Sequence, residues 1–231
     1  MFTSRVLRGV FAAALLLAPF AALAAEDDVV PADKEPRHVP KLVNEWVRLV
    51  DVEIPEGEQT LYHRHSFDYP YVLVTSVTLY NQIYGQEPKD VKMEAGFVGY
   101  YDAATKGAYT HRFINRGPGV FRAIGIELLK PQANESGKVA NFPGVEPVVN
   151  NERVAAYKFR LAPGASTGML RIPGPSIRVA LGNGSISEGG SGPSTSTQLA
   201  PAQFVFREQA VTTTVSNTGD MPVEWVEFVL K

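Results

Sequence analysis

Two of the four histidines of this 231-residue chain stand two positions apart, in the stretch LYHRHSFDYPYV at residues 61–72. Side chains at positions i and i+2 of a β-strand point to the same face, so His63 and His65 can converge on one ion. A third imidazole has to come from a neighbouring strand, and we expect His111, in KGAYTHRFINRG, to supply it. The spacing predicts a three-histidine metal site, and a hydrogen-bonded pair of core histidines is the alternative.

A carboxylate close to the histidines is the next candidate ligand. Asp68 lies shortly after His65 and is a candidate fourth ligand. By the alternation of a strand it points away from His63 and His65 unless Pro70 bends the chain. His38, the remaining histidine, lies in a proline-rich stretch and is predicted to be exposed or incidental.

Two further side chains are candidates for chemistry at such a site. Tyr109 shares a strand face with His111, where its phenol would donate a proton or bind a substrate; core packing is the simpler interpretation. Arg122 alternates in step with Ile124 and Ile126, so an inward face would make it a buried cation suited to a substrate carboxylate. The alternative places Arg122 at a strand edge that reaches water.

Short β-type segments must position these residues. Between residues 41 and 130 the chain contains the runs WVRLVDVEI, YVLVTSVTLYNQIY, AGFVGYYDA, YTHRFIN and VFRAIGIELL, separated by Gly, Pro and Asn. No long amphipathic helical pattern interrupts them. Regularly spaced short strands predict an all-β chain that folds as a sandwich or a barrel.

The same pattern occurs twice along the chain. NEWVRLVDVEIPEG at residues 44–57 aligns without a gap with NERVAAYKFRLAPG at residues 151–164. The copies also end alike, in INRGPGVFRAIGIELLK and SNTGDMPVEWVEFVLK. We infer an internal duplication of roughly eighty to ninety residues per copy. In the second copy Leu170, Ile172 and Thr213 fall at the positions of the three histidines, so this half is predicted to hold no metal.

The motifs resemble those of the cupin superfamily. Gly57 is followed after five residues by His63 and His65, and His111 is followed after three residues by Asn115, as in the two cupin motifs. Because the resemblance extends over both copies, the chain looks like a bicupin. The resemblance implies two tandem double-stranded β-helix barrels of the RmlC-like jelly-roll type, with a metal held inside the first.

The chain departs from the family pattern at one ligand. The glutamate expected three or four residues after the second histidine is replaced by Tyr69 or Pro70. The resemblance therefore implies a three-histidine site with open coordination positions, as in some cupin-type thiol and diketone dioxygenases. The ion would be one divalent transition metal, Fe, Zn, Cu, Mn or Ni, because imidazoles alone do not select among them.

Residues 1–24 carry Arg5 and Arg8, then an apolar run that ends in Ala-Leu-Ala, which is typical of a secretory signal peptide. An uncleaved membrane anchor is the alternative. The chain has no cysteine, so it needs no disulfides outside the cytoplasm. We expect a periplasmic or secreted protein. Its expected parts are a signal peptide (1–24), an extended arm mostly without regular structure (25–40), a first barrel with the metal site (41–131), a linker (132–150) and a degenerate second barrel (151–231).

Charge and composition narrow the function further. The net charge is −2 and there is no basic excess, which argues against nucleic acid as a partner. After cleavage we expect no membrane partner, and either a monomer or a homodimer. The leading interpretation is an exported metal-dependent bicupin that acts on a small organic molecule, with dioxygenase-type oxidoreductase chemistry. The alternative is a non-catalytic module that binds a small ligand or a metal.

Overall fold

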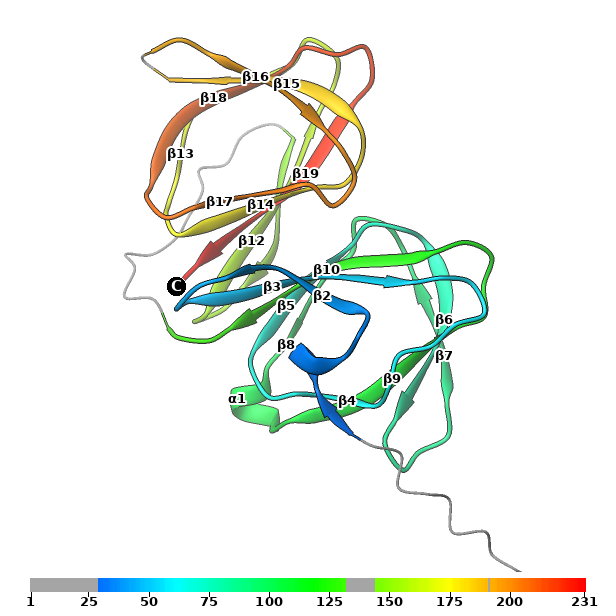
Figure 1. Cartoon of the computed structure of the whole chain (residues 1–231). Helices are drawn as coiled ribbons and strands as arrows, with labels where there is room; N and C mark the ends of the chain where they lie inside the picture. The colour runs from blue at the N-terminus through cyan, green and yellow to red at the C-terminus, as the bar shows by residue number, and fades with distance from the viewer. Residues whose placement is uncertain (1–28, 132–143, 191) are drawn as a thin grey trace, which may run out of the picture.

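The computed structural model describes residues 29–131, 144–190 and 192–231, and in these residues the chain forms two β-barrels in tandem (Figure 1). Antiparallel pairing dominates all four sheets. The described helices are two single turns, η1 (Ala32–Lys34) and α1 (Ala103–Lys106), and neither is long enough to cross a membrane. The prediction of an all-β chain with two tandem barrels is confirmed.

Barrel 1 consists of two five-stranded sheets. The first contains, in spatial order, β1 (Val30–Pro31), β4 (His63–His65), β9 (Tyr109–Asn115), β6 (Val77–Ile83) and β7 (Lys89–Met93). The second contains β2 (His38–Val43), β3 (Val47–Ile54), β10 (Phe121–Leu128), β5 (Tyr69–Leu73) and β8 (Val98–Tyr101). The two sheets enclose the apolar interior of barrel 1.

Barrel 2 repeats this arrangement with one strand fewer. Its five-stranded sheet contains β11 (Val145–Asn150), β12 (Val154–Leu161), β19 (Val223–Leu230), β14 (Ser176–Ala180) and β17 (Phe204–Arg207). Its four-stranded sheet contains β13 (Ser166–Ile172), β18 (Val211–Asn217), β15 (Gly184–Gly189) and β16 (Thr195–Leu199).

Two buried asparagines show the duplication at the level of single hydrogen bonds. In barrel 1 the amide nitrogen of Asn115 donates to the carbonyl of Ile54 at 2.8 Å. In barrel 2 the amide nitrogen of Asn217 donates to the carbonyl of Leu161 at 3.0 Å. Each asparagine also accepts from the backbone N–H two residues further on. The shared Asn near the end of each copy therefore ties the last hairpin of its barrel to the first long strand.

Replacing Asn217 with alanine is expected to lower the free energy of unfolding by about 2–3 kcal/mol. The variant loses three hydrogen bonds of roughly 1 kcal/mol each in a site that is closed to water. Urea unfolding of the variant and of Asn150→Ala, which removes an exposed asparagine on β11, measures the difference. Equal stability of the two variants would contradict the anchoring role.

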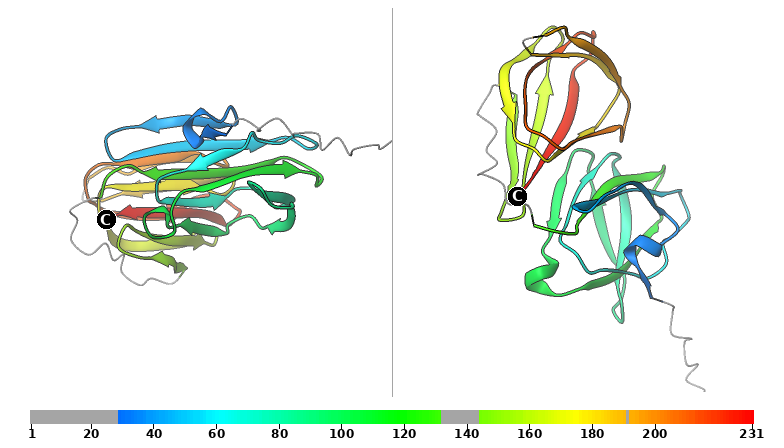
Figure 2. Two further views of the ribbon diagram at one scale, coloured as in Figure 1. Left: turned by 90° about the horizontal axis from the view of Figure 1, so that it is seen from below. Right: turned by 60° about the vertical axis from the view of Figure 1, so that its left-hand side comes forward.

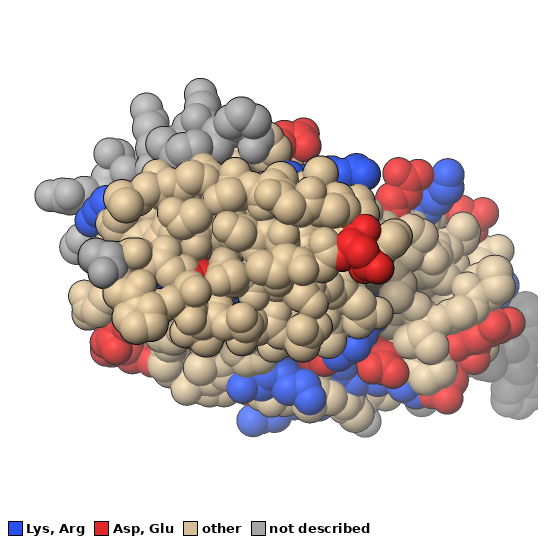
Figure 3. Space-filling model, turned by 90° about the horizontal axis from the view of Figure 1, so that it is seen from above, with Lys and Arg blue, Asp and Glu red and all other residues tan. Residues whose placement is uncertain are grey.

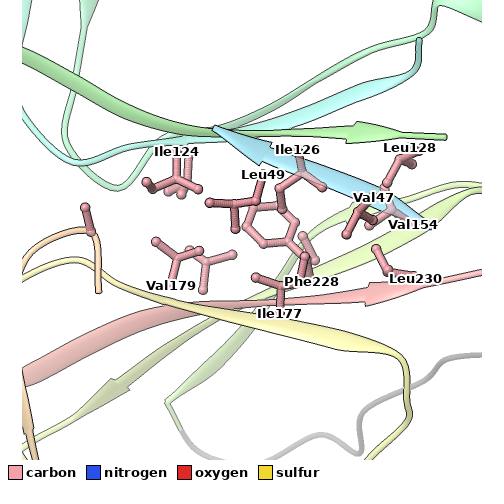
Figure 4. Close-up of a cluster of buried hydrophobic side chains, with 14 of the residues drawn as sticks. Val47, Leu49, Ile124, Ile126, Leu128, Val154, Ile177, Val179, Phe228 and Leu230 are labelled. Carbon is pink, nitrogen blue, oxygen red and sulfur yellow. The ribbon is translucent and has the colours of Figure 1, made fainter. Parts of the chain in front are cut away.

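The two barrels pack against each other through their five-stranded sheets. Leu49 and Ile126 of barrel 1 and Ile177 and Phe228 of barrel 2 belong to one cluster of buried side chains (Figure 4). The sheet of β3, β10 and β5 is therefore apolar on both faces, because its other face lines the interior of barrel 1. The right-hand view of Figure 2 again shows the two barrels side by side.

The N-terminal segment, residues 29–43, differs from the expected arm. β2 pairs antiparallel with β3, and β1 pairs parallel with β4, so that Val30 stands beside His63. β1 and η1 lie on the side of barrel 1 away from barrel 2 (Figures 1 and 2). Part of the expected linker also differs, since residues 145–150 form β11. Its residues 132–143, like the expected signal peptide, lie outside the described residues.

Candidate metal centre

Neighbouring strands bring three histidines together inside barrel 1. β4 and β9 are antiparallel, and His63 stands directly opposite His111 while His65 stands opposite Tyr109. All three histidines are buried, and each offers a ring nitrogen that lies within 4.8 Å of the other two. That spacing suits three imidazoles that share one ion, since a metal–nitrogen bond is about 2.0–2.1 Å long.

Hydrogen bonds on the outer side of the rings fix which nitrogen is free. Nδ1 of His63 lies 2.9 Å from the carbonyl oxygen of Leu61, and Nδ1 of His111 lies 2.8 Å from Oδ1 of Asn81. Because both partners are acceptors, Nδ1 carries the hydrogen and Nε2 keeps its lone pair. Nε2 of His63 is buried without a hydrogen-bond partner, as is Nδ1 of His65. Buried nitrogens left in this state fit a metal site, where the ion is the missing partner.

Burial keeps the histidines in the neutral form that binds metal. It lowers the pKa of His63 to about 4, although the bond to Leu61 opposes the shift. Burial, together with the neighbouring His63, lowers the pKa of His65 to about 3. The pKa of His111 also falls well below its usual value, first through burial and then through the adjacent histidines. All three are therefore neutral near pH 7.

The prediction that His38 is an exposed histidine is wrong. Its side chain is buried at 4% exposure, and its ring centroid lies 4.5 Å from that of His63 and 5.8 Å from that of His65. Its Nδ1 donates to the carbonyl of Ala32 at 3.0 Å. The prolines around His38 suggested an arm, but short extended segments can pair with a sheet, and the pairing of β2 with β3 turns the ring inward.

The histidines open into a cavity of about 390 Å³ with aromatic walls. Five tyrosines and two phenylalanines line it, and of the described residues no Asp, Glu, Lys or Arg does. Tyr109 lies in this wall with its ring 4.5 Å from that of His111, and its hydroxyl accepts a hydrogen bond from Nδ2 of Asn81 at 2.8 Å. Asn81 thus holds His111 and Tyr109 together, a link between strands that no motif in the sequence indicated.

Comparison with known proteins supports the same architecture. No family model and no curated protein matches the chain. Among solved structures, a variant of oxalate decarboxylase from Bacillus subtilis matches with a TM-score of 0.57 and 11% identity, over 81% of this chain and 70% of its own. A cupin 2 conserved barrel domain protein from Leptotrichia buccalis has a TM-score of 0.50 and 11% identity, over 82% and 86%. The chain has a two-barrel cupin fold. AerE from Microcystis aeruginosa is similar over 85% of this chain and 98% of its own, with a TM-score of 0.51 and 12% identity.

The structure places Asp68 outside the cupin cavity. One carboxylate oxygen accepts from the backbone N–H of Ala104 at 3.0 Å, and the other lies 2.8 Å from Nη1 of Arg153. Arg153 belongs to barrel 2 and also donates to the carbonyl of Leu128. The expectation of a fourth ligand at Asp68 is corrected accordingly, because both oxygens are engaged where the two barrels meet.

Arg122 also lies away from the metal centre. It does share a face with Ile124 and Ile126, but that face packs on barrel 2 and not on the cavity. Its guanidinium pairs with Asp51 of the adjacent strand, with an Nη2–Oδ2 distance of 2.7 Å. The inward orientation proposed for substrate binding is therefore wrong. Arg122 is an ion-pairing residue beside the junction of the barrels, with a weak 3.5 Å contact to the carbonyl of Pro201.

Barrel 2 carries apolar or small polar residues where barrel 1 carries its histidines. Leu170 of β13 stands opposite Thr213 of β18, in the register that places His63 opposite His111. Ile172 likewise takes the position of His65, opposite Val211. Leu170 and Ile172 are both almost fully buried in the core of barrel 2.

The size of two side chains decides which barrel keeps a cavity. On β10, Gly125 stands opposite Tyr71, and at the matching place on β19 Glu227 stands opposite Arg178. Two residues earlier along the same strands, barrel 1 has Ala123 on β10 where barrel 2 has Trp225 on β19. Small residues leave space for the cavity wall of barrel 1, whereas Trp225 and Glu227 fill the interior of barrel 2.

The interior of barrel 2 holds charged side chains, whereas the outer face of its four-stranded sheet has few. Glu227 is fully buried and bonds to Arg178 and Arg207, and both of these arginines also reach Glu188. The view onto the four-stranded sheet shows a broad outer face with few charged residues (Figure 3), where β16 and β18 are rich in Ser and Thr. Barrel 2 therefore holds an internal ion-pair network where barrel 1 holds a neutral cavity.

Gly125→Ala is expected to lower the free energy of unfolding by about 1–3 kcal/mol and to distort the cavity. A methyl group at this position would overlap the hydroxyl of Tyr69, which packs directly over Gly125 beside His65. Thermal unfolding measures the cost, and Gly182→Ala is the matched control because nothing lies near its added methyl. Equal melting temperatures for the two variants would contradict this packing.

Proposed function

We propose that this chain is an exported, metal-dependent cupin that oxidises a small, uncharged organic molecule in a dioxygenase-type reaction. The observation that carries the proposal is the set of three buried, neutral imidazoles that line an aromatic cavity, each with a ring nitrogen within 4.8 Å of the other two. Export rests on the signal-peptide pattern of residues 1–24, and it gives a periplasmic or secreted location.

A divalent transition metal fits the donor set of His63, His65 and His111. Three neutral ligands leave the full charge of the ion and several coordination positions free. Fe, Zn, Cu, Mn and Ni all accept imidazole, so the residues do not select the metal. Oxalate decarboxylase from Bacillus subtilis, a neighbour at 11% identity, is described as having Mn(II) centres, which supports metal binding in this fold. When bound, a redox-active metal would supply the site that brings dioxygen and substrate together.

The remaining residues orient the substrate and exclude water. Burial raises the pKa of Tyr109, so the phenol stays protonated and can donate a hydrogen bond into the cavity while accepting one from Asn81. The aromatic rings around it offer flat apolar surfaces for a planar molecule. In a dioxygenase-type reaction both atoms of dioxygen enter the substrate, which supplies the electrons, so no other reductant is needed.

The absence of charged side chains from the described cavity wall favours an uncharged substrate. A small dicarboxylate would find no arginine or lysine among the described residues of the cavity wall. An uncharged phenol or diketone would instead bury its carbon skeleton against the aromatic rings and present its oxygens to the metal and Tyr109. The cavity of about 390 Å³ suits a molecule of this size.

A non-catalytic binding module is the second candidate. The observation that favours it is the same neutral wall, since among the described residues no carboxylate lines the cavity to act as a general base. Such a module would bind a small ligand or metal in barrel 1 as a monomer or a homodimer, without turnover.

An oxygen electrode separates the two functions. The mature protein, purified without chelators and loaded in turn with each of the five metals, is incubated with small phenols and β-diketones. Oxygen uptake that disappears in His63→Ala/His65→Ala supports the dioxygenase. Saturable ligand binding without oxygen uptake supports the binding module, and retention of full metal content in the double variant would overturn the site itself.

A further inference from the structure

The fourth histidine of the chain enters the metal centre from outside both sequence motifs. His38 belongs to β2, in the N-terminal segment, and it lines the same cavity as the other three histidines. Its Nδ1 donates to the carbonyl of Ala32, so its Nε2 keeps a free lone pair. The ring therefore has the same protonation pattern as His63 and His111, with Nδ1 as the donor and Nε2 unprotonated.

Several contacts hold the N-terminal segment firmly on β4. Its Val30 donates a backbone hydrogen bond to the carbonyl of Tyr62 at 2.9 Å and pairs with His63. The buried carboxylate of Glu35 accepts from the backbone N–H of Leu61 at 3.2 Å. The segment thus pairs with the strand that carries two of the candidate ligands, and His38 lies beside them.

The centroid distances from His38 to two of the other rings agree with imidazoles that share one ion. A metal–nitrogen bond of about 2.1 Å puts each ring centroid roughly 3.2 Å from the ion, so two such rings lie about 4.5–6.4 Å apart at angles of 90–180°. The distances from His38 are 4.5 Å to His63 and 5.8 Å to His65. Those among the other three rings are 4.5, 4.9 and 5.3 Å. His38 falls in this range toward His63 and His65, but the ring nitrogens that lie within 4.8 Å of one another are those of His63, His65 and His111, so the His38 ring must move toward them to bind the same ion.

We propose that His38 is the fourth nitrogen ligand of the metal in barrel 1. It takes the role of the carboxylate that is missing after His65, where Tyr69 packs over Gly125 and offers no anion. The metal then fastens the N-terminal segment to the barrel, so metal binding and docking of residues 29–43 stabilise each other. This inference deepens the proposed function and rests on its metal site.

Copper(II) is the probe, because its electron paramagnetic resonance spectrum reports the number of bound nitrogens. The wild-type protein is expected to show four nitrogen couplings, and His38→Ala three, with the copper dissociation constant raised about 100-fold. Adding ¹⁵N-imidazole to His38→Ala should restore affinity and introduce a ¹⁵N coupling. Val39→Ala, which removes an exposed side chain from the same strand, should match wild type.

The outcomes separate the ligand from the site as a whole. An unchanged spectrum and dissociation constant in His38→Ala would overturn the fourth ligand while leaving the three-histidine site intact. If ¹⁵N-imidazole restored the copper affinity of His38→Ala without a ¹⁵N coupling, the fourth ligand would also be overturned, because the ring would then have a merely structural role. Wild-type protein that binds no copper would overturn both this inference and the proposed function, whereas loss of all copper in His63→Ala/His65→Ala supports the site.

Discussion

Replacing His111 with alanine is expected to lower the metal content of the purified protein from about one equivalent in the wild type to less than about a tenth. The variant removes the only candidate ligand on β9, directly opposite His63, and leaves Asn81 without its imidazole partner. Plasma mass spectrometry on protein purified without chelators measures the metal content. Any oxygen uptake should fall with it.

Thr110→Ala is the matched control for this variant. Thr110 is the neighbour of His111 on β9, but its hydroxyl faces away from the cavity and contacts Arg64. The control should keep its metal, and both variants should remain folded by circular dichroism. Full metal occupancy in His111→Ala would show that the three imidazoles do not share an ion.

Replacing Arg178 with leucine is expected to lower the free energy of unfolding by about 3 kcal/mol or more. The change breaks a buried ion-pair network and leaves the fully buried Glu227 with Arg207 as its remaining charged partner. Breaking a buried pair by removing one partner typically costs about 3–5 kcal/mol, because the other charge stays in the core. Urea unfolding followed by tryptophan fluorescence suits the measurement, since Trp225 lies beside Arg178.

The control for the network is an exposed pair in the same barrel. Arg160 lies 3.3 Å from Glu224 with most of its side chain in water. Arg160→Ala should cost less than about 1 kcal/mol, as exposed ion pairs generally do. If Arg178→Leu were as stable as Arg160→Ala, the network would be dispensable and the leucine would be filling its space as an ordinary core residue.

The sequence pattern correctly predicted the features of the site that depend on alternation within a single strand or on the internal duplication. The i, i+2 spacing of His63 and His65 put both on one face, because alternation is a property of any β-strand. The duplication identified Leu170 and Thr213 as the partners that replace His63 and His111, and they stand opposite each other in β13 and β18. Such features follow from chain geometry and need no knowledge of how the sheets pack.

The sequence did not predict which face of β10 carries Arg122, and the reason is the packing of this strand between the two barrels. β10 is apolar on both faces, one lining the cavity and the other packing on barrel 2, so alternation could not say which face holds Arg122. The same packing decided that Asp68 pairs with Arg153 across the barrels instead of turning toward the histidines.

By itself, the sequence determined the class of fold, the repeat and the three motif histidines, because these follow from strand alternation and from the spacing of residues within short motifs. Only the tertiary structure decided that His38 joins them, since β2 meets β3 and β1 meets β4 through pairing that no local pattern encodes. The cavity is likewise a tertiary property. Gly125 leaves room for Tyr69 of the neighbouring strand β5 in barrel 1, whereas Glu227 fills the matching space in barrel 2.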